Sequence, residues 1–287
     1  MPDLPVLAID IGGTKTLVAL VEGAKVLGRR RIETDRAAGA EAWLDALAGV
    51  AAEWEGRFTL AGAAVTGRIT EGRWSAVNPA VLPVPDRFPL VEALQERLAV
   101  PVIAANDAQA AAWGEYRFGA GQGLDLVFMT VSTGLGGGLV LGGRLLTGRS
   151  GLAGHIGQVL ADPCEGSQRL EDIVSGSALA RIGDPRNIIA AAARGDTGAE
   201  EQIQAVAVPL LRAMRSLQLL LDPDYFVVGG GLGLAEGFIA RLRRLAHDIE
   251  PDYRPDIRAA ALGAEAGLIG IADLARTQRT SATEVDR

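Results

Sequence analysis

The sequence is poor in the residues that build disulfide frameworks and zinc sites. Its 287 residues include one cysteine, Cys164, and two histidines, His155 and His247. A single cysteine cannot form an intramolecular disulfide, and this composition suits the reducing cytoplasm. Two histidines and one cysteine also cannot supply the usual ligand spacing of a zinc site. We therefore expect a cytoplasmic protein without structural zinc.

Excess positive charge and long apolar runs are also missing. Lys and Arg number 28 against 35 Asp and Glu, which gives a formal net charge of -7. Clusters of Lys and Arg bind nucleic acids and anionic membrane surfaces, so neither is an expected partner. No uncharged stretch is long enough to span a membrane, and Asp10 interrupts the first apolar run, unlike a signal peptide. A small molecule is the expected ligand.

What the sequence does contain is one unusual pattern twice. An apolar run with a glycine turn, residues 4–15, continues into two β-like runs that end near residue 32, which predicts a meander of three strands. The same pattern returns over residues 126–146. This repetition predicts a duplicated core, and the length of the chain favours two lobes with a cleft between them.

Alternating helix and strand signals occupy most of the remaining sequence, which predicts an α/β fold. The expected helices are residues 40–54, 89–98, 178–194, 200–221 and 234–249. The expected strands are residues 60–65, 100–105 and 225–228. A polar tail, residues 277–287, is expected to be disordered.

The first glycine turn has the residue types of a phosphate-binding loop. Asp10-Ile11-Gly12-Gly13-Thr14-Lys15 leads into a strand, whereas a nucleotide P-loop needs Gly-Lys-Ser/Thr at the start of a helix. The glycines let backbone N–H groups and the Thr14 hydroxyl approach phosphate oxygens. Asp10 at the strand end can hold Mg²⁺ directly or through water. The alternative interpretation is an ordinary glycine hairpin.

Two later glycine-rich segments extend this hypothesis. Thr133-Gly134 begins the second glycine turn, and two facing cradles suit a triphosphate held for phosphoryl transfer. Gly229-Gly230-Gly231 stands at a strand-to-helix junction, where a helix N-terminus binds phosphate or the backbone lets adenosine approach. Alone, this third segment is also consistent with a tight turn.

Asn106-Asp107 ends an apolar strand and precedes a strong helix-forming segment, residues 108–113. Both residue types favour the N-cap of a helix, which is one interpretation. The other is a general base, because a sugar hydroxyl that attacks the γ-phosphorus must lose a proton that a carboxylate can accept. His155, among the glycines of residues 151–157, is interpreted as a hydroxyl-binding side chain.

These segments together resemble the ROK family of sugar kinases, and the match covers nearly the whole chain. The segments in the family's order and spacing are residues 10–15, 106–115, 133–138 and 151–157. The resemblance implies an α/β, two-lobed actin-like ATPase (ribonuclease H-like) fold with a duplicated core, and a homodimer. The expected small lobe spans 1–106, joined by a C-terminal helix near 264–276, and the large lobe spans 107–263.

The resemblance also implies a role for each candidate residue. Asp107 is the expected catalytic base. The residues expected to contact the sugar are Gly67, Arg68, Asn78, Asn106, His155, Gln158 and Glu171. The residues expected to meet ATP are Asp10, Gly12, Gly13, Thr14, Lys15, Thr133, Gly134 and Gly230. Mg²⁺ is expected to accompany ATP, with Asp10 as its protein ligand.

One family feature is missing from the sequence. Members usually carry a histidine after Ile-Gly, followed by a cysteine-rich segment, and together these bind structural zinc. Here the two places read Gln158 and Cys164 to Leu170. We expect Gln158 to keep a hydrogen bond to the sugar in a wall that lacks the metal.

The sequences of residues 106–113 and 151–157 are most similar to those of family members that act on N-acetylmannosamine. This implies ATP-dependent phosphorylation of the 6-hydroxyl of that sugar in sialic acid catabolism. We interpret Gly67 as leaving room for an acyl group and Arg68 as facing its oxygen. The alternatives are a hexokinase for glucose or N-acetylglucosamine, a DNA-binding repressor of the family, and a non-catalytic sugar-binding protein.

Overall fold

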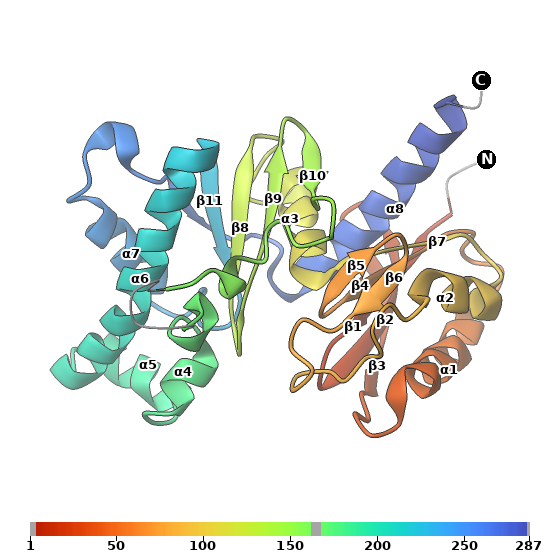
Figure 1. Ribbon diagram of the computed structural model, residues 1–287, viewed down its shortest axis with the longest axis horizontal. Helices are drawn as coiled ribbons and strands as arrows, with labels where there is room; N and C mark the ends of the chain where they lie inside the picture. The colour runs from red at the N-terminus through yellow and green to blue at the C-terminus, as the bar shows by residue number, and fades with distance from the viewer. Residues whose placement is uncertain (1–3, 162–167, 286–287) are drawn as a thin grey trace. The chain divides into compact units, whose positions relative to one another are not determined.

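The computed structural model describes residues 4–161 and 168–285, so the expectation for Cys164 lies outside the described residues. The chain divides into two compact units, whose helices and strands are labelled in Figure 1. Unit 1 consists of Met1–Gly114, Thr147–Ala153 and Glu265–Arg287, and unit 2 of Glu115–Leu146 and Gly154–Ala264. Over the two described ranges, no helix combines the length and apolarity needed to cross a membrane.

A five-stranded mixed sheet forms the centre of unit 1. Its strands are β1 (Val6–Ile11), β2 (Lys15–Glu22), β3 (Lys25–Glu33), β4 (Ala61–Val65) and β7 (Val102–Asn106). Their order is β3-β2-β1-β4-β7, with antiparallel pairing among β3, β2 and β1 and parallel pairing among β1, β4 and β7. The predicted N-terminal meander is confirmed.

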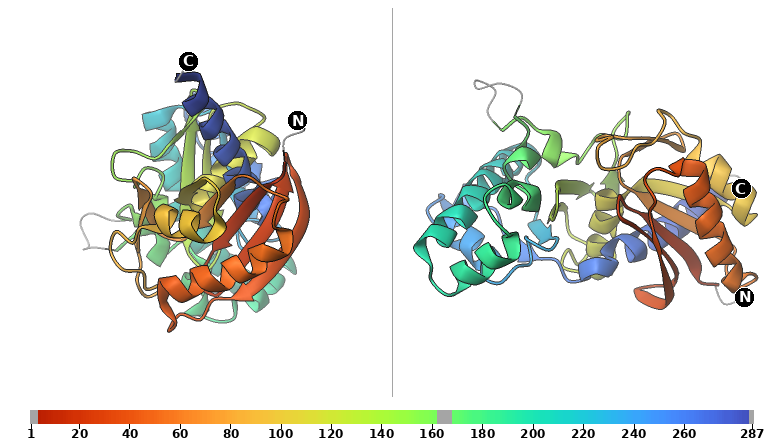
Figure 2. Two further views of the ribbon diagram at one scale, coloured as in Figure 1. Left: turned by 90° about the vertical axis from the view of Figure 1, so that its right-hand side faces the viewer. Right: turned by 90° about the horizontal axis from the view of Figure 1, so that it is seen from below.

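The two faces of this sheet pack against different helices. The helices concerned are α1 (Gly39–Ala51), α2 (Leu90–Leu98), α3 (Asp107–Phe118) and α8 (Ala266–Val285). Side chains alternate along a strand, so Ile9 joins the buried core with α1 and α2. Asp10 belongs to the other face, against which α8 packs (Figure 2).

Glycines let α3 and α8 approach each other closely. A Cβ at Gly270 would lie 1.8 Å from the carbonyl oxygen of Ala110, and one at Gly114 would lie 2.5 Å from that of Ala266. Because these contacts hold the first turns of α3 in unit 1, the unit boundary follows Gly114 rather than residue 106. α8 is helical as far as Val285, through most of the tail that the sequence suggested to be disordered.

Unit 2 repeats the sheet of unit 1. Its strands are β8 (Leu126–Val131), β9 (Leu135–Leu141), β10 (Arg144–Leu146), β11 (Tyr225–Gly229) and β12 (Ile257–Ala259). Their order is β10-β9-β8-β11-β12, again with two antiparallel pairings followed by two parallel ones. The predicted duplication of the core is confirmed, because strand order and strand direction correspond element by element.

The helices of unit 2 differ in detail from the prediction. They are α4 (Gly176–Ala180), α5 (Pro185–Ala193), α6 (Thr197–Leu221) and α7 (Phe238–Ala246). One continuous helix over 178–194 is wrong, because Asp184 caps a new helix by accepting a hydrogen bond from the Arg186 N–H, and Pro185 follows it. α7 starts after Gly237, whose φ of 77° places it in the left-handed region, and so begins later than residue 234.

Several short elements carry little local signal and were not predicted. The additional strands are β5 (Arg68–Thr70) and β6 (Arg73–Ser75), besides β12. The single-turn helices that were not expected are η2 (Ile156–Gln158), η3 (Leu170–Asp172), η4 (Pro251–Tyr253) and η5 (Gly263–Glu265), whereas η1 (Ala52–Trp54) lies within the helix expected over 40–54. β5 and β6 pair as a hairpin whose Trp74 is fully buried, so tertiary packing rather than local sequence stabilises them.

Candidate active site

The candidate base begins helix α3, directly after strand β7. Asn106 caps this helix, since its Oδ1 accepts hydrogen bonds from the N–H groups of Ala108 (2.9 Å) and Gln109 (3.1 Å). Its Nδ2 donates to the Gly67 carbonyl at 2.8 Å and to Asp107 Oδ1 at 2.9 Å. Both N–H bonds of the amide are therefore used within the protein, and Asn106 orients Asp107 as well as capping the helix.

The Asp107 carboxylate is held at both oxygens. Its Oδ1 also accepts from the Ala108 N–H at 2.8 Å, and its Oδ2 accepts from the Thr66 hydroxyl at 2.9 Å. The side chain is partly exposed, so the hydroxyl group of a ligand can reach it. Sequence reasoning missed Thr66 as a site residue. The available signal was its place after β4, because Val65 pairs with Asn106 in parallel register.

Asp10 lies on β1, which pairs in parallel with β4, the strand that ends just before Thr66. Burial, and then the negative charge of Asp107, raise the pKa of Asp10 from 3.8 to about 7, against a smaller lowering by Lys15. A Cβ at Gly267, in the first turn of α8, would lie 4.0 Å from Asp10 Oδ2 and 3.8 Å from the Asp107 carbonyl oxygen. The carboxyl ends of β1, β4 and β7 thus bring Asp10, Thr66 and Asp107 together, which is where open α/β sheets bind ligands.

The first glycine turn closes the β1–β2 hairpin. The Gly12 N–H donates to the Lys15 carbonyl at 3.0 Å, and the side chains of Thr14 and Lys15 are exposed. A Cβ at Gly13 would lie 2.7 Å from the carbonyl oxygen of Val81, so glycine is needed for the contact between these two loops. The predicted phosphate loop is therefore packed against the loop that carries Asn78.

Asn78 stabilises its own loop. Its Oδ1 accepts from the Ala80 N–H at 3.1 Å, and its carbonyl accepts from the Val81 N–H at 2.9 Å. These bonds form a turn of the type that asparagine favours. Neither of them uses the Nδ2 group, which leaves two donors for a ligand.

Gly67 is required by the backbone rather than by a ligand. Its φ is 122°, and a Cβ would lie 2.6 Å from the Ser75 carbonyl oxygen and 2.9 Å from Trp74 Nε1. The space beside Gly67 is therefore filled by the β5–β6 hairpin, which corrects the interpretation that it leaves room for an acyl group. The next residue, Arg68, has a side chain that is 34% exposed and lies 3.9 Å from Asp86.

In unit 2, the second glycine turn borders a pocket. The turn is held by the N–H of Gly176, which donates to the Ser132 carbonyl at 2.6 Å, and by that of Ser177, which donates to the Thr133 carbonyl at 3.1 Å. The pocket has a volume of about 490 Å³, and its lining includes Ser132, Thr133, Ser177, Arg186 and Gly231. Sequence reasoning missed Ser177 and Arg186, since neither belongs to a glycine-rich segment.

The third glycine segment packs on the end of β8. Gly230 has a φ of 84°, and a Cβ there would lie 2.4 Å from the Val131 carbonyl oxygen. The same carbonyl accepts hydrogen bonds from Leu232 and Gly233, both at 3.0 Å. The structure therefore places Gly230 next to Gly231 of the pocket, in a turn that only glycine can adopt without strain.

The remaining predicted sugar residues lie in or beside η2 and η3 of unit 2. Both ring nitrogens of His155 are shielded from solvent. Gln158 Nε2 donates to Glu171 Oε1 at 2.9 Å, and Glu171 also lies near the second glycine turn, since a Cβ at Gly134 would be 3.5 Å from its Oε2. Gln158 and Glu171 are therefore brought together.

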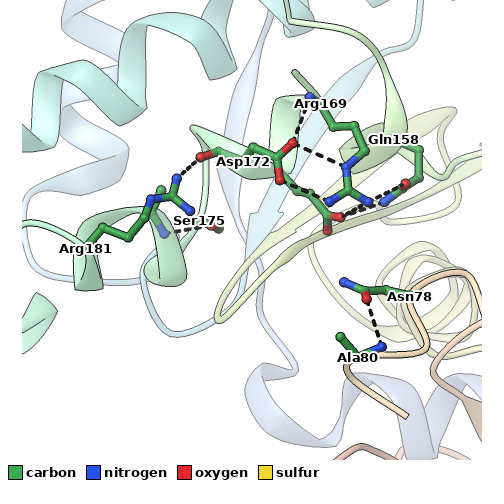
Figure 3. A network of polar contacts seen from close by, with 9 residues as sticks. Asn78, Ala80, Gln158, Arg169, Asp172, Ser175 and Arg181 are labelled. Carbon is green, nitrogen blue, oxygen red and sulfur yellow. Dashed lines mark hydrogen bonds and ion pairs between the residues drawn. The ribbon is translucent and has the colours of Figure 1, made fainter. Parts of the chain in front are cut away.

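Arg169 links these side chains into one network, part of which is drawn in Figure 3. It donates to Gln158 Oε1 at 3.2 Å, lies 3.1 Å from Glu171 Oε1, and binds both oxygens of Asp172. The hydrogen bond to Asp172 raises the pKa of Arg169, and the same bond lowers the pKa of Asp172. Arg181 donates to the Asp172 carbonyl and extends the network. Sequence reasoning missed Arg169.

Potential metal ligands are not clustered in the part of the chain that is described. Over residues 4–161 and 168–285, no three His, Cys, Asp or Glu side chains form a group that could hold a metal ion. Asp10 and Asp107 remain a pair of carboxylates at one sheet edge, where burial, and then the charge of Asp107, raise the pKa of Asp10.

Comparisons with known proteins show which family this chain is similar to. Bifunctional enzyme NanE/NanK of Brucella melitensis is 48% identical over 283 residues, which are 96% of this chain and 55% of that protein. N-acetylmannosamine kinase of Shigella boydii is 40% identical over 287 residues, 95% and 99% of the two chains. The crystal structure of a ROK family glucokinase from Streptomyces griseus with glucose and AMPPNP is 31% identical, with a TM-score of 0.81 and coverage of 95% and 99%.

The chain thus spans about half the length of the bifunctional relatives it matches and nearly all of the Shigella kinase. The actin-like α/β fold with a duplicated core, expected from the sequence, is confirmed. The model of the ROK family matches residues 6–278, which is most of the sequence and includes the two glycine turns and Asp107. With that match and relatives at 40% and 48% identity, the chain belongs to the ROK family.

Proposed function

We propose that this chain transfers the γ-phosphoryl group of ATP to the 6-hydroxyl of N-acetylmannosamine. The observation that carries the proposal is the placement of Asp10, Thr66 and Asp107 at the carboxyl ends of three neighbouring parallel strands. The relatives named for N-acetylmannosamine kinase support the choice of sugar. The activity belongs to sialic acid catabolism.

Asp107 is the general base in this proposal. As the sugar oxygen bonds to the γ-phosphorus, the hydroxyl proton passes to Asp107, and the bond from that phosphorus to the bridging oxygen breaks to release ADP. Thr66 and the Ala108 N–H hold the carboxylate so that one oxygen faces the acceptor. Asn106 acts through Asp107 and the helix cap, as a positioning residue.

The phosphate groups are assigned to the two glycine turns. The Gly12 N–H closes the hairpin, so the Gly13 N–H with the exposed Thr14 and Lys15 is assigned to bind from unit 1, and Thr133 with Gly134 from unit 2. The pocket beside Thr133 and Gly231 has the volume and mixed lining of a small-molecule site, and is assigned to the nucleoside.

Asp10 fits a Mg²⁺ ion that arrives with ATP. Mg²⁺ prefers carboxylate oxygen and is commonly held by one or two carboxylates together with substrate phosphates. Burial first, and the negative charge of Asp107 second, raise the pKa of Asp10, and a bound cation would favour its ionised form. When bound, the ion neutralises charge on the phosphate oxygens.

For the sugar, the assigned side chains are Arg68, Asn78, His155, Gln158 and Glu171. Gly67 and Asn106, also expected from the sequence to contact the sugar, support the site through the backbone and through Asp107. The bond from Ala80 to Asn78 uses Oδ1 and not Nδ2, and Arg169 contacts both Gln158 and Glu171. A site whose polar groups match one epimer leaves them unpaired with another, at about 1–3 kcal/mol for each buried group. Discrimination between N-acetylmannosamine and N-acetylglucosamine is therefore expected to exceed ten-fold.

A coupled ADP-release assay with a panel of sugars tests the proposal. N-acetylmannosamine should give the highest kcat/KM, with activity that depends on Mg²⁺. The second candidate, a hexokinase for glucose, is favoured by the 31% identity to the Streptomyces glucokinase. If glucose or N-acetylglucosamine is at least ten-fold better, the sugar assignment is wrong. If no sugar stimulates ADP release, the kinase assignment is wrong as well.

Two properties of the whole protein are also proposed. The family resemblance implies a homodimer, which analytical ultracentrifugation tests directly. The single cysteine among 287 residues supports a reducing, cytoplasmic location, which fractionation of cells tests.

A further inference from the structure

Unit 1 contains a second polar pocket, whose lining includes neither Asp10 nor Asp107. It has a volume of about 280 Å³, and its lining contains four arginines and one acidic residue. The charged lining residues are Arg68, Arg73, Arg87, Arg149 and Glu71. Such a concentration of positive charge stands out in a chain whose formal net charge is -7.

Neighbouring acids pair only weakly with two of these arginines, Arg68 and Arg87. Arg87 lies 3.8 Å from Glu71, and Arg68 lies 3.9 Å from Asp86. Both distances are long for ion pairs, and the two carboxylates are 81% and 75% exposed. Exposed pairs of this kind contribute about 1 kcal/mol or less, so the guanidinium groups remain able to bind an anion.

The wall that carries Arg73 and Arg87 is held by buried contacts. Trp74 and Phe88 exchange backbone hydrogen bonds of 2.7 and 2.8 Å, which ties the β5–β6 hairpin to the segment that follows it. The buried Ser75 hydroxyl donates to Asp86 at 2.7 Å and accepts from the Arg87 N–H at 3.0 Å. The backbone on both sides of the pocket is therefore positioned by the fold.

The segment that carries Arg149 is anchored to the same hairpin. The Thr70 hydroxyl donates to the Ser150 carbonyl at 2.9 Å. A Cβ at Gly151 would lie 2.2 Å from the Ile69 carbonyl oxygen, so only glycine allows this approach. Gln109 Nε2 holds the end of the segment through the Ala153 carbonyl at 2.8 Å. The pocket is a built feature of unit 1.

We propose that this pocket is a binding site, separate from the catalytic carboxylates, for a sugar phosphate of hexosamine size. A phosphate monoester carries close to two negative charges at pH 7, and the guanidinium fork of arginine matches its oxygens in pairs. The volume is several times the roughly 30 Å³ that one water occupies in the liquid, which leaves room for a sugar ring beside the phosphate. Thr70 and Ser75 line the same space.

The choice of ligand rests on the proposed function, because a hexosamine phosphate is the product of that reaction. Arg68 belongs both to this pocket and to the residues assigned to the substrate sugar. A ligand that engages Arg68 in the pocket withdraws it from the substrate. The pocket therefore lets the product restrain its own formation without occupying the catalytic site.

Titration calorimetry at one fixed ionic strength tests the site, with the full chain and N-acetylmannosamine 6-phosphate as the probe. The test variant is Arg73→Ala/Arg149→Ala, which leaves Arg68 and the catalytic residues in place. The matched control is Arg31→Ala/Arg57→Ala, which removes two exposed arginines elsewhere in unit 1. We expect the test variant to lose one of two binding events, or to weaken it at least ten-fold, while the control behaves as the wild type.

If all three titrations superimpose, the pocket does not bind the sugar phosphate and the inference is overturned. If inorganic phosphate binds as tightly as the sugar phosphate, the site is a bare anion site and the assigned ligand is wrong. Failure of the proposed function would give a different result. N-acetylmannosamine would then cause no ADP release, while the sugar phosphate would still bind the wild type more tightly than the test variant. In the kinase assay, the test variant should keep kcat within about two-fold and lose part of the rise in KM for the sugar that added product causes in the wild type.

Discussion

The two units have the same strand order but differ in the residues at the ends of corresponding strands. Asp10 is next to last in β1, and Thr130 holds the same position in β8. The outer parallel strand of unit 1 leads into Asp107, whereas that of unit 2 leads into Ala260. One backbone plan is thus combined with carboxylates in unit 1 and with small uncharged residues in unit 2.

The two halves of this duplicated fold therefore carry different chemical groups at corresponding strand ends. Paired carboxylates suit a proton acceptor and a cation, and burial together with the charge of Asp107 raises the pKa of Asp10. Glycine and hydroxyl residues, such as Gly230 and Thr133, let backbone donors approach phosphate without adding negative charge. Changing the strand-end residues should therefore alter catalysis in unit 1 more than changes in supporting contacts do.

The largest expected effect follows from Asp107→Asn. The variant keeps the size of the side chain and removes the proton acceptor, so kcat should fall by about 10²–10⁴, the usual contribution of a general base. Sugar affinity should stay within a few-fold, because the amide still fits the space of the carboxylate. Steady-state kinetics and calorimetry with the sugar measure the two quantities.

A purely structural role for Asp107 would give a different result. Because Asn106 supplies the helix cap, loss of Asp107 as a cap residue should cost at most about 1 kcal/mol of folding free energy. Turnover per folded molecule would then be unchanged. Retained turnover with lowered unfolding free energy would contradict the assignment of Asp107 as the base.

The second expected effect is that Asp10→Asn stabilises the ligand-free chain at neutral pH. Unfolding returns the carboxyl from a pKa of about 7 to its ordinary 3.8. Between these values the folded chain binds more protons than the unfolded chain, so this group's contribution to stability falls as pH rises through that window. Each pKa unit corresponds to about 1.4 kcal/mol, which makes the gain on substitution a few kcal/mol.

Urea unfolding of both proteins at pH 5 and pH 8 measures this effect. The stability difference between Asp10→Asn and the wild type should be larger at pH 8, where the wild-type carboxylate is ionised. Asp248→Asn, which changes an exposed aspartate of unit 2, serves as the control and should show no such difference. An equal difference at both pH values would contradict the electrostatic origin.

The third effect is smaller and concerns Thr66, which supports the base from the end of β4. Thr66→Val removes the 2.9 Å hydrogen bond to Asp107 Oδ2 while keeping the shape of the side chain. Hydrogen bonds to charged groups contribute about 1.5–3 kcal/mol, and solvent can replace part of this one, so kcat should fall about ten-fold with little change in KM. Thr66→Ser should restore kcat. If serine does not rescue the defect, packing rather than the hydroxyl explains it.

Local signals account for what could be predicted of the fold. Each meander combines β-forming runs with a glycine turn a few residues away, so neighbouring residues contain the information. The helix expected over 178–194 is interrupted because Asp184 and Pro185 start a new helix, a local signal that was overlooked. The β5–β6 hairpin could not be predicted, because burial of Trp74 and its bridge to Phe88 stabilise it from a distance.

Local signals likewise account for only part of the candidate site. Asp10 and Asp107 each end an apolar run, which sequence alone reveals, but the charge interaction between them depends on how β1, β4 and β7 pair. Thr66 and Arg169 were missed because their importance lies in partners 41 and 11 residues away, namely Asp107 and Gln158. Contacts of this kind are decided by tertiary packing and leave no periodic pattern.

The smallest expected effect is in unit 2, where Arg169→Ala removes the centre of the network around Gln158. Arg169 is one-third exposed and binds Asp172 through both carboxylate oxygens. Exposed ion pairs contribute about 0.2–1 kcal/mol each, so the variant should lose about 1 kcal/mol of unfolding free energy at pH 7. Because the bond from Arg169 lowers the pKa of Asp172, this contribution is present above the ordinary pKa and is lost as pH falls.

Unfolding in urea at pH 7 and pH 3, beside the exposed control Arg212→Ala, measures the stability change of Arg169→Ala. The difference from the wild type should shrink at pH 3, and the control should show none. Since Gln158 and Glu171 lose their common partner, KM for the sugar should also rise about three- to ten-fold while kcat stays near the wild-type value, as for a change in ground-state binding. A fall in kcat with unchanged KM would instead indicate that Arg169 acts on the transferred phosphoryl group. Unit 2 would then contribute a positively charged side chain to catalysis, in addition to its glycine and hydroxyl residues.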